Sequence, residues 1–223
     1  GLDFVELEPG RYAFLGIELR TYDGGREIAE GVIVEVDDDG TMETVWRLFD
    51  RFPPDLALTY PELPPFQGVE VTSHLNSLFW DRDADAFVVT NAKPTKEGVG
   101  PAVFYVDRST GEEIWILGHE FGDFENLDPT PLLERPHSSE LGEDGDLLLF
   151  NRGRLGPDGQ PEKCATALKI ELDMEAMTAQ SGWSYIPEPC FVGHFLGQVS
   201  QMYNGNIFAD YASVGRIDEV TPE

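Results

Sequence analysis

The sequence is poor in basic residues, cysteines, long apolar runs and helical periodicity, and each shortage excludes a class of protein. Fifteen Lys and Arg stand against 42 Asp and Glu, which leaves a net charge of −27. Such a surface repels nucleic acid and anionic membranes, so we expect neither as a partner. No apolar run approaches the roughly 20 residues that a membrane-spanning helix needs. No signal peptide is visible, so we expect a cytosolic chain or a mature product.

The acidic residues are spread through short turns and are not gathered in one tail. Three such turns read "VDDDG" (36–40), "DRDAD" (81–85) and "GEDGD" (142–146). This distribution fits a solvated acidic surface without a ligand, a protein of a high-salt environment, or loops that bind calcium. Apart from calcium in these loops, we expect no cofactor.

The chain has two cysteines, Cys164 and Cys190, 26 positions apart. They form one disulfide in an oxidising compartment, or they are two buried free thiols. Neither belongs to a CxxC pair, so a redox or zinc-binding role is not indicated.

Short apolar or alternating runs, bounded by Gly, Pro, Asp and Asn, indicate strands and turns along the whole chain. The clearest runs are 32–36, 86–90, 102–106, 113–117, 146–150 and 166–172. Only "DMEAMTAQ" (173–180) has a helix-like composition. Because it lies between two strand-like runs, we expect an extended turn there.

These runs form a repeat marked by tryptophan. Trp46, Trp115 and Trp183 are 69 and 68 positions apart, and each lies on a strand that follows an acidic turn. Another strand pair precedes each of these units. Four strands and a recurring aromatic predict an all-β propeller, in which the tryptophans pack blade against blade. The predicted blades span approximately 1–50, 69–118, 134–186 and 195–223.

The fourth of these units stops before its tryptophan strand. Propellers typically close with four to eight blades, and an unpaired strand edge is a liability. We therefore expect that the chain does not close on itself and that another chain or further sequence completes the propeller. A closed, strand-swapped ring of four blades is the alternative.

Three stretches carry a resemblance to a known family: "SHLNSLFWDRDADAFVVTNA" (73–92), "VFYVDRSTGEEIWILG" (103–118) and "PHSSELGEDGDLLLFNRG" (136–153). They resemble the arylsulfate sulfotransferase propellers, and the likeness runs in order over essentially the whole chain. It implies a six-bladed, periplasmic or secreted enzyme that moves a sulfuryl group from an aryl sulfate to a phenol without a nucleotide donor. A histidine becomes transiently sulfated in that family.

The resemblance assigns roles to three residues. His74 and Asn76 match the family's histidine and asparagine that bind the sulfuryl oxygens, and His137 matches the nucleophile. A neutral imidazole is a competent nucleophile near neutral pH. We expect its pKa near 6.5, raised a little by the acidic surface.

The chain also departs from the family pattern. Leu2-Asp3 stands where the first blade carries His-Asp, Ala92 stands at the place of an arginine, and Ser138 follows His137 in place of aspartate. Two anion-binding groups are therefore missing.

Two basic residues end equivalent strands, Lys93 and Arg152, and we expect either to replace the missing arginine in substrate binding. His194, just before the fourth unit's inner strand, is a further candidate for substrate binding. His119 replaces a glycine of the family pattern, and we expect it on a loop between blades.

Three functions compete. The first is aryl sulfotransfer through His137, and the second is a propeller that has lost catalysis and serves as an extracellular binding or structural module. The third is a calcium-dependent, lactonase-like hydrolase, which needs carboxylates that face the channel. Glu70 and Glu140 lie near suitable strands, but no spacing singles them out.

Overall fold

The computed structural model describes residues 3–22, 24–52, 70–71, 73–92, 101–118 and 122–222. Within these ranges the only helical segments are α1 (Leu48–Arg51) and the short 3-10 helix η1 (Ala212–Val214). The prediction of an all-β chain is confirmed. None of the described helices is long and apolar enough to cross a membrane.

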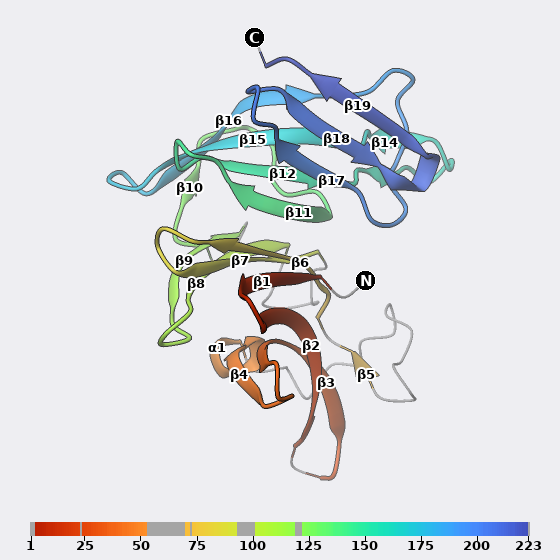
Figure 1. The fold of residues 1–223 in the computed structure, drawn as a ribbon. Coiled ribbons are helices and arrows are strands. Elements are labelled where there is room, and N and C mark those ends of the chain that lie inside the picture. Colours follow the sequence, from red (N-terminus) through yellow and green to blue (C-terminus); the bar gives the residue numbers. More distant parts are fainter. Residues whose placement is uncertain are drawn as a thin grey trace.

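Apart from four short strands, the strands form four antiparallel sheets in chain order, shown from red to blue in Figure 1. The first sheet contains β1 (Phe4–Glu8), β2 (Arg11–Thr21), β3 (Glu27–Asp37) and β4 (Met42–Arg47). The second contains β6 (Leu75–Asp81), β7 (Ala86–Asn91), β8 (Ala102–Asp107) and β9 (Glu113–Gly118). The third contains β11 (Pro136–Leu141), β12 (Leu147–Asn151), β15 (Thr166–Asp173) and β16 (Thr178–Tyr185). The fourth contains β17 (Gln198–Gln201), β18 (Ile207–Tyr211) and β19 (Arg216–Val220).

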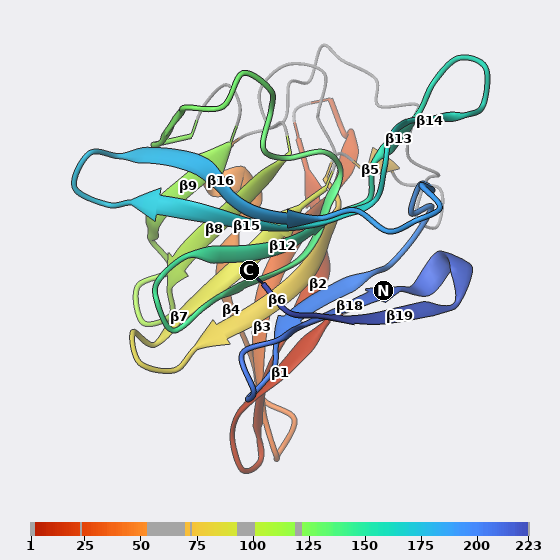
Figure 2. The same ribbon diagram turned by 90° about the horizontal axis from the view of Figure 1, so that it is seen from above.

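Four shorter strands are present in addition to these sheets. β10 (Glu125–Asn126) pairs in parallel with β16, and β5 (Glu70–Val71) pairs in parallel with β3. The predicted second unit began at residue 69, but β5 belongs to the first sheet. A hairpin of β13 (Arg154–Leu155) and β14 (Pro161–Lys163) projects away from the sheets in Figure 2.

Apolar layers between consecutive sheets form the core. Separate clusters of buried side chains join the first sheet to the second, the second to the third, and the third to the fourth. Each cluster draws on alternate residues of facing strands, as expected for sheets packed face to face. At one close approach, a Cβ on Gly31 of β3 would lie 2.5 Å from the Leu75 side chain, so this position requires glycine.

The tryptophans occupy one equivalent place in three sheets. Trp46 and Trp115 are buried, and Trp183 packs against the third cluster. Each lies on the fourth strand of its sheet, and a β-bulge precedes each one because the preceding residue has no partner on the third strand. These unpaired residues are Val45, Ile114 and Gly182. The predicted core role is confirmed for Trp46 and Trp115, whereas Trp183 is only partly buried. The repeat extends to backbone irregularities.

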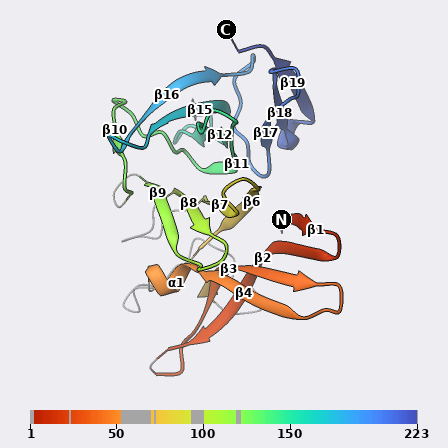
Figure 3. The same ribbon diagram turned by 60° about the vertical axis from the view of Figure 1, so that its left-hand side comes forward.

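The first strands of the four sheets are neighbours. β1 packs against β6, β6 against β11, and β11 against β17. Figures 1 and 3 show these strands following one another along the stack. Residues at the start of these strands therefore meet, although they are distant in sequence.

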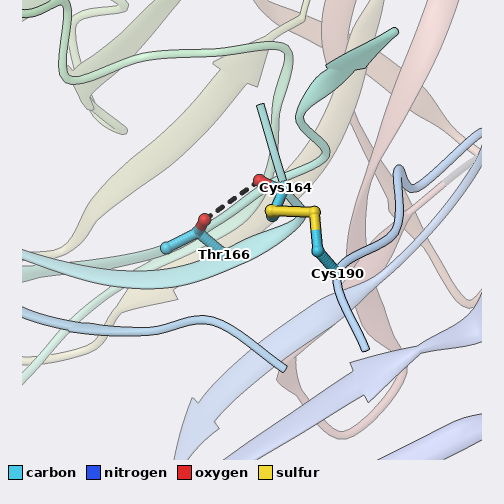
Figure 4. The surroundings of a disulfide bond; sticks show 3 residues. All are labelled: Cys164, Thr166 and Cys190. Carbon is cyan, nitrogen blue, oxygen red and sulfur yellow. Dashed lines mark hydrogen bonds between the residues drawn. A yellow bond between two sulfur atoms is a disulfide. The ribbon is translucent and has the colours of Figure 1, made fainter. Parts of the chain in front are cut away.

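The two cysteines form a disulfide, with a Cα–Cα distance of 5.4 Å (Figure 4). The bond holds the segment before β15 against the loop between β16 and β17. Ala165 N–H donates to Phe191 O at 2.7 Å beside it. The segment "DMEAMTAQ" is not helical, as predicted, but the turn covers only residues 174–177, because Asp173 ends β15 and residues 178–180 begin β16.

Candidate functional site

A pocket of about 250 Å³ lies where the first strands meet. Strands of three sheets contribute polar groups to it: Asn76 from β6, His137 and Ser138 from β11, and Gln198 from β17. The remaining lining residues are Asp3, Leu196, Gly197, Asp210 and Ala212. The structure thus brings together two predicted site residues, Asn76 and His137, that are 61 positions apart.

The pairing of β6 and β11 with the second strands of their sheets shows which residues of β6 and β11 are equivalent. Leu75 pairs with Asn91 in the second sheet, and Pro136 pairs with Asn151 in the third. The residues that follow them, Asn76 and His137, therefore correspond. The expectation that His74 and His137 occupy equivalent places is wrong.

The counterpart of His74 is Arg135. Ala92 N–H donates to His74 O, and Arg152 N–H donates to Arg135 O in the same way. Arg152 therefore occupies, one sheet further on, the position that Ala92 has in the second sheet. The side chain of His74 is half-buried, and its backbone N–H donates to the Asn91 side chain.

His137 is a neutral imidazole in this structure. Burial lowers its pKa to about 4, helped by the nearby charges of Arg152 and His74, while a polar contact with the Gly197 backbone opposes the shift. The expected value near 6.5, raised by the acidic surface, is therefore wrong, because loss of solvent outweighs the distant carboxylates. Its Nδ1 is enclosed and has no hydrogen-bond partner.

A buried cation lies close to this histidine. Arg152 is 5% exposed, and its Nε donates to Arg135 O at 3.2 Å. Burial, together with the charge of Arg135, lowers the pKa of Arg152 to about 10, so it stays charged at neutral pH. Among the described residues no carboxylate pairs with it.

Arg135 is a second guanidinium without a carboxylate in the described part of the chain. Its nitrogens donate to the carbonyls of Gly153 and His194 at 3.3 and 3.5 Å. In a chain with 42 acidic residues, two adjacent unpaired arginines make a local positive region. A buried unpaired charge is costly, and an anionic ligand removes that cost.

The backbone around the pocket is strained. Three of the described non-glycine residues with positive φ lie here, namely Arg135, Ser138 and Leu196, with φ of 54°, 51° and 52°. Gly197 has φ of 107°, and a Cβ there would lie 2.2 Å from the Phe150 ring. Such strain clusters at sites where the surrounding structure holds a functional geometry.

The amide of Asn76 has a fixed orientation. Its Nδ2 donates to Pro136 O at 3.0 Å, so the oxygen cannot take that place. Oδ1 is buried and has no donor. Asn76 was expected to donate to sulfuryl oxygens, but in this orientation it mainly offers an unsatisfied acceptor.

The other predicted residues lie at the margin or outside the description. The His194 side chain is exposed, and only its carbonyl contacts Arg135. Lys93, His119, Leu2 and the side chain of Glu70 lie outside the described residues. Sequence reasoning missed Arg135 and Asp210. Alignment of "RPH" (135–137) with "HLN" (74–76) would have revealed Arg135, whereas nothing local marks Asp210.

Glu140, one of the two carboxylates considered for a lactonase-like site, is not part of the pocket lining. Glu140 accepts the Gln201 N–H at 2.7 Å and links β11 to β17 outside the pocket lining. Burial raises its pKa. No group of three or more His, Cys, Asp or Glu residues able to hold a metal occurs in the part of the chain that the structure describes.

Three comparisons with known proteins add to this geometry. A comparison with curated protein sequences gave no match. Among solved structures, the periplasmic gluconolactonase PpgL of Pseudomonas aeruginosa is similar at 12% identity and a TM-score of 0.33, over 99% of this chain and 71% of that one. The model of the arylsulfotransferase (ASST) family matches residues 3–222. The resemblance seen in the sequence is thereby confirmed, and the chain belongs to the arylsulfotransferase (ASST) family.

Proposed function

We propose that this chain transfers a sulfuryl group from an aryl sulfate to a phenol through a sulfohistidine formed on His137. One observation carries the proposal: a neutral, half-buried imidazole lies beside a buried guanidinium that has no carboxylate partner among the described residues. Covalent catalysis of this kind divides one difficult transfer into two easier steps.

In the first step the lone pair of His137 Nε2 attacks sulfur, with the ring proton on Nδ1. The N–S bond forms as the S–O bond to the donor breaks, and the electron pair leaves on the phenolate. In the second step the oxygen of the acceptor phenol attacks the same sulfur, and the N–S bond breaks. Nε2 recovers its lone pair. The acceptor phenol loses its proton, and the phenolate released in the first step takes up one, so no net proton is gained or lost.

Arg152 stabilises the negative charge on the sulfuryl oxygens, because it is charged, desolvated and near His137. It takes over the role of the arginine that the family pattern has at Ala92. Arg152 occupies in the third sheet the position that Ala92 occupies in the second. Arg135, the counterpart of His74, adds positive potential. Lys93 stays a candidate for the same role.

The four sheets are blades of one propeller in this proposal, with their first strands around the central axis. The equivalent bulges, the equivalent tryptophans and the contacts between consecutive first strands support this architecture. Sequence or a chain beyond these four sheets supplies the remaining blades. The disulfide supports a periplasmic or secreted location, because such bonds persist in oxidising compartments.

Transfer from p-nitrophenyl sulfate to phenol tests the proposal through release of p-nitrophenol. His137→Gln should abolish transfer, and Arg152→Gln should lower kcat/KM about 10²- to 10³-fold. Arg154→Gln is the matched control, because this exposed arginine pairs with Glu162 on the projecting hairpin, and its activity should be unchanged. With donor alone, intact-protein mass should show one added sulfuryl group on the unmutated protein and none on His137→Gln.

An unchanged rate in His137→Gln would show that another group is the nucleophile. The second candidate function is a binding or structural module without catalysis, which the loss of the family arginine at Ala92 favours. No transfer by the unmutated protein at any salt concentration would decide for that candidate.

A further inference from the structure

We infer that the pocket beside His137 selects a positively charged acceptor, a phenol that carries an ammonium group, and that Asp210 binds this group. The inference names the acceptor class and rests on the proposed function. It concerns the part of the site that receives the second substrate, whereas Arg152 acts on the sulfuryl group.

The charges of the pocket lining are negative. Asp3 and Asp210 are the two acidic residues of the lining, and neither Lys nor Arg belongs to it. Asp3 accepts the backbone N–H groups of Phe4 and Leu78 at 3.1 and 3.0 Å. A ligand that fills this space meets two carboxylates.

Asp210 has no partner of its own. It lies on β18 opposite Gln198 and Ile217. Within the described residues no hydrogen bond or ion pair involves its carboxylate. The arginine of the adjacent strand, Arg216, is engaged elsewhere, with Asp218 at 2.9 Å and Glu188 O at 2.6 Å. Asp210 is therefore available to a ligand.

A second observation points to a ligand that donates hydrogen bonds. Asn76 lines the same pocket and is 4% exposed, and its Oδ1 is buried without a donor. A buried acceptor left unsatisfied costs roughly 1–3 kcal/mol, and an N–H or O–H of the ligand removes this cost. Gln198 adds a side-chain carbonyl, because its amide nitrogen donates to Ser200 at 3.3 Å.

The pocket suits one small aromatic molecule. Its volume of about 250 Å³ lies just below the range of roughly 300–1,000 Å³ for drug-sized ligands. Leu196 and Ala212 supply the apolar part of the lining, against which a ring can pack. A phenol with a short ammonium side chain places its hydroxyl at His137 and its charge at Asp210.

The experiment compares three acceptors of similar size and different charge, with p-nitrophenyl sulfate as donor. These are tyramine, p-propylphenol and p-hydroxyphenylpropionate. We expect kcat/KM for tyramine to exceed that for p-propylphenol about tenfold or more, with p-hydroxyphenylpropionate the poorest. In Asp210→Asn the advantage of tyramine over p-propylphenol should disappear, while transfer to p-propylphenol stays measurable.

The matched control is Asp158→Asn, an exposed turn residue on the projecting hairpin. It removes the same charge from the protein, so it separates a local effect from the net charge of −27. The tyramine advantage should persist in this variant. Equal kcat/KM values for tyramine and p-propylphenol, or an unchanged ratio in Asp210→Asn, would overturn the inference.

A binding measurement distinguishes failure of the inference from failure of the proposed function. Calorimetric titration with tyramine does not depend on turnover. If no acceptor is sulfated but Asp210→Asn weakens tyramine binding about tenfold and Asp158→Asn does not, the ammonium site stands and the proposed reaction fails. If transfer occurs and tyramine binds both variants equally, the reaction stands and the ammonium site is refuted.

Discussion

At the scale of single residues, burial determines the chemistry of His137. The ring is buried at the start of β11, and the guanidinium of Arg152 is the nearby charge with the largest effect on its pKa. Both effects favour the neutral form. His137 therefore stays neutral, and able to act as a nucleophile, down to a lower pH than a solvent-exposed histidine does.

The pH dependence of activity and stability should follow from this shift. The acid limb of kcat/KM should have its midpoint near the His137 pKa of about 4, and not near 6.5. The neutral ring also contributes stability, which is complete above the unfolded-state pKa of about 6.5 and is lost as pH falls from there towards 4. The total loss is roughly 3 kcal/mol.

Two measurements check this prediction. The first is NMR titration of the His137 ring protons, and the second is the urea unfolding free energy at pH 7 and pH 5. Because His137→Gln does not titrate, the variant should lose less stability over this interval than the unmutated protein. A ring pKa at or above 6.5 would contradict the prediction.

At the scale of elements, the bulge and tryptophan on each fourth strand join neighbouring sheets. Trp46 packs against Phe104 of the second sheet with ring centroids 5.2 Å apart. Its Nε1 donates to Glu113 Oε1 at 2.7 Å. The bulge at Val45 brings the ring to this place, so one backbone irregularity serves both packing and a hydrogen bond between sheets.

Trp46→Phe should therefore destabilise the fold by about 2–3 kcal/mol. The smaller ring leaves a cavity, and a hydrogen bond to a charged group contributes roughly 1.5–3 kcal/mol. Urea unfolding monitored by far-UV circular dichroism gives the difference. Trp183→Phe is the comparison, because Trp183 is only partly buried, and we expect about 1 kcal/mol or less. Equal losses in both variants would show that the contact with Glu113 adds nothing.

At the scale of the whole molecule, the charge of −27 opposes the compact state. Ion pairs relieve it locally, as where Arg108 joins Glu35 of the first sheet to Asp85 of the second. With 42 acidic and 15 basic residues, most carboxylates have no cation of their own. Repulsion among the carboxylates therefore has a larger long-range effect on stability than the attraction within ion pairs.

Added salt should consequently stabilise the protein. Screening shortens the range of repulsion from about 30 Å at 0.01 M to about 3 Å at 1 M salt. We expect the melting temperature at pH 7 to rise by several degrees between about 0.05 and 0.5 M NaCl. At pH 4 the rise should be smaller, because carboxylates begin to take up protons there. A fall in melting temperature with salt at pH 7 would show that the ion pairs dominate.

Local signals in the sequence were enough to predict the strands, the turns and the repeat. Alternation of apolar residues and the acidic turns are local signals, so the four-stranded units and the core role of the tryptophans could be predicted. Family membership was also visible in contiguous motifs. The two cysteines left a disulfide and free thiols equally open, because pairing depends on where the loop before β17 folds back.

Tertiary structure alone decided the composition of the site. Register between β11 and β12 matched His137 with Asn76 and Arg135 with His74, and one bulge is enough to shift such an equivalence. The lowered pKa of His137 and the unpaired state of Arg152 depend on which charges and how much solvent the neighbouring sheets leave nearby. Asp210, 73 positions after His137, reaches the same pocket only because consecutive first strands pack side by side. Local sequence pattern fixes secondary structure, whereas desolvation and charge pairing are properties of surfaces that meet only in the folded chain.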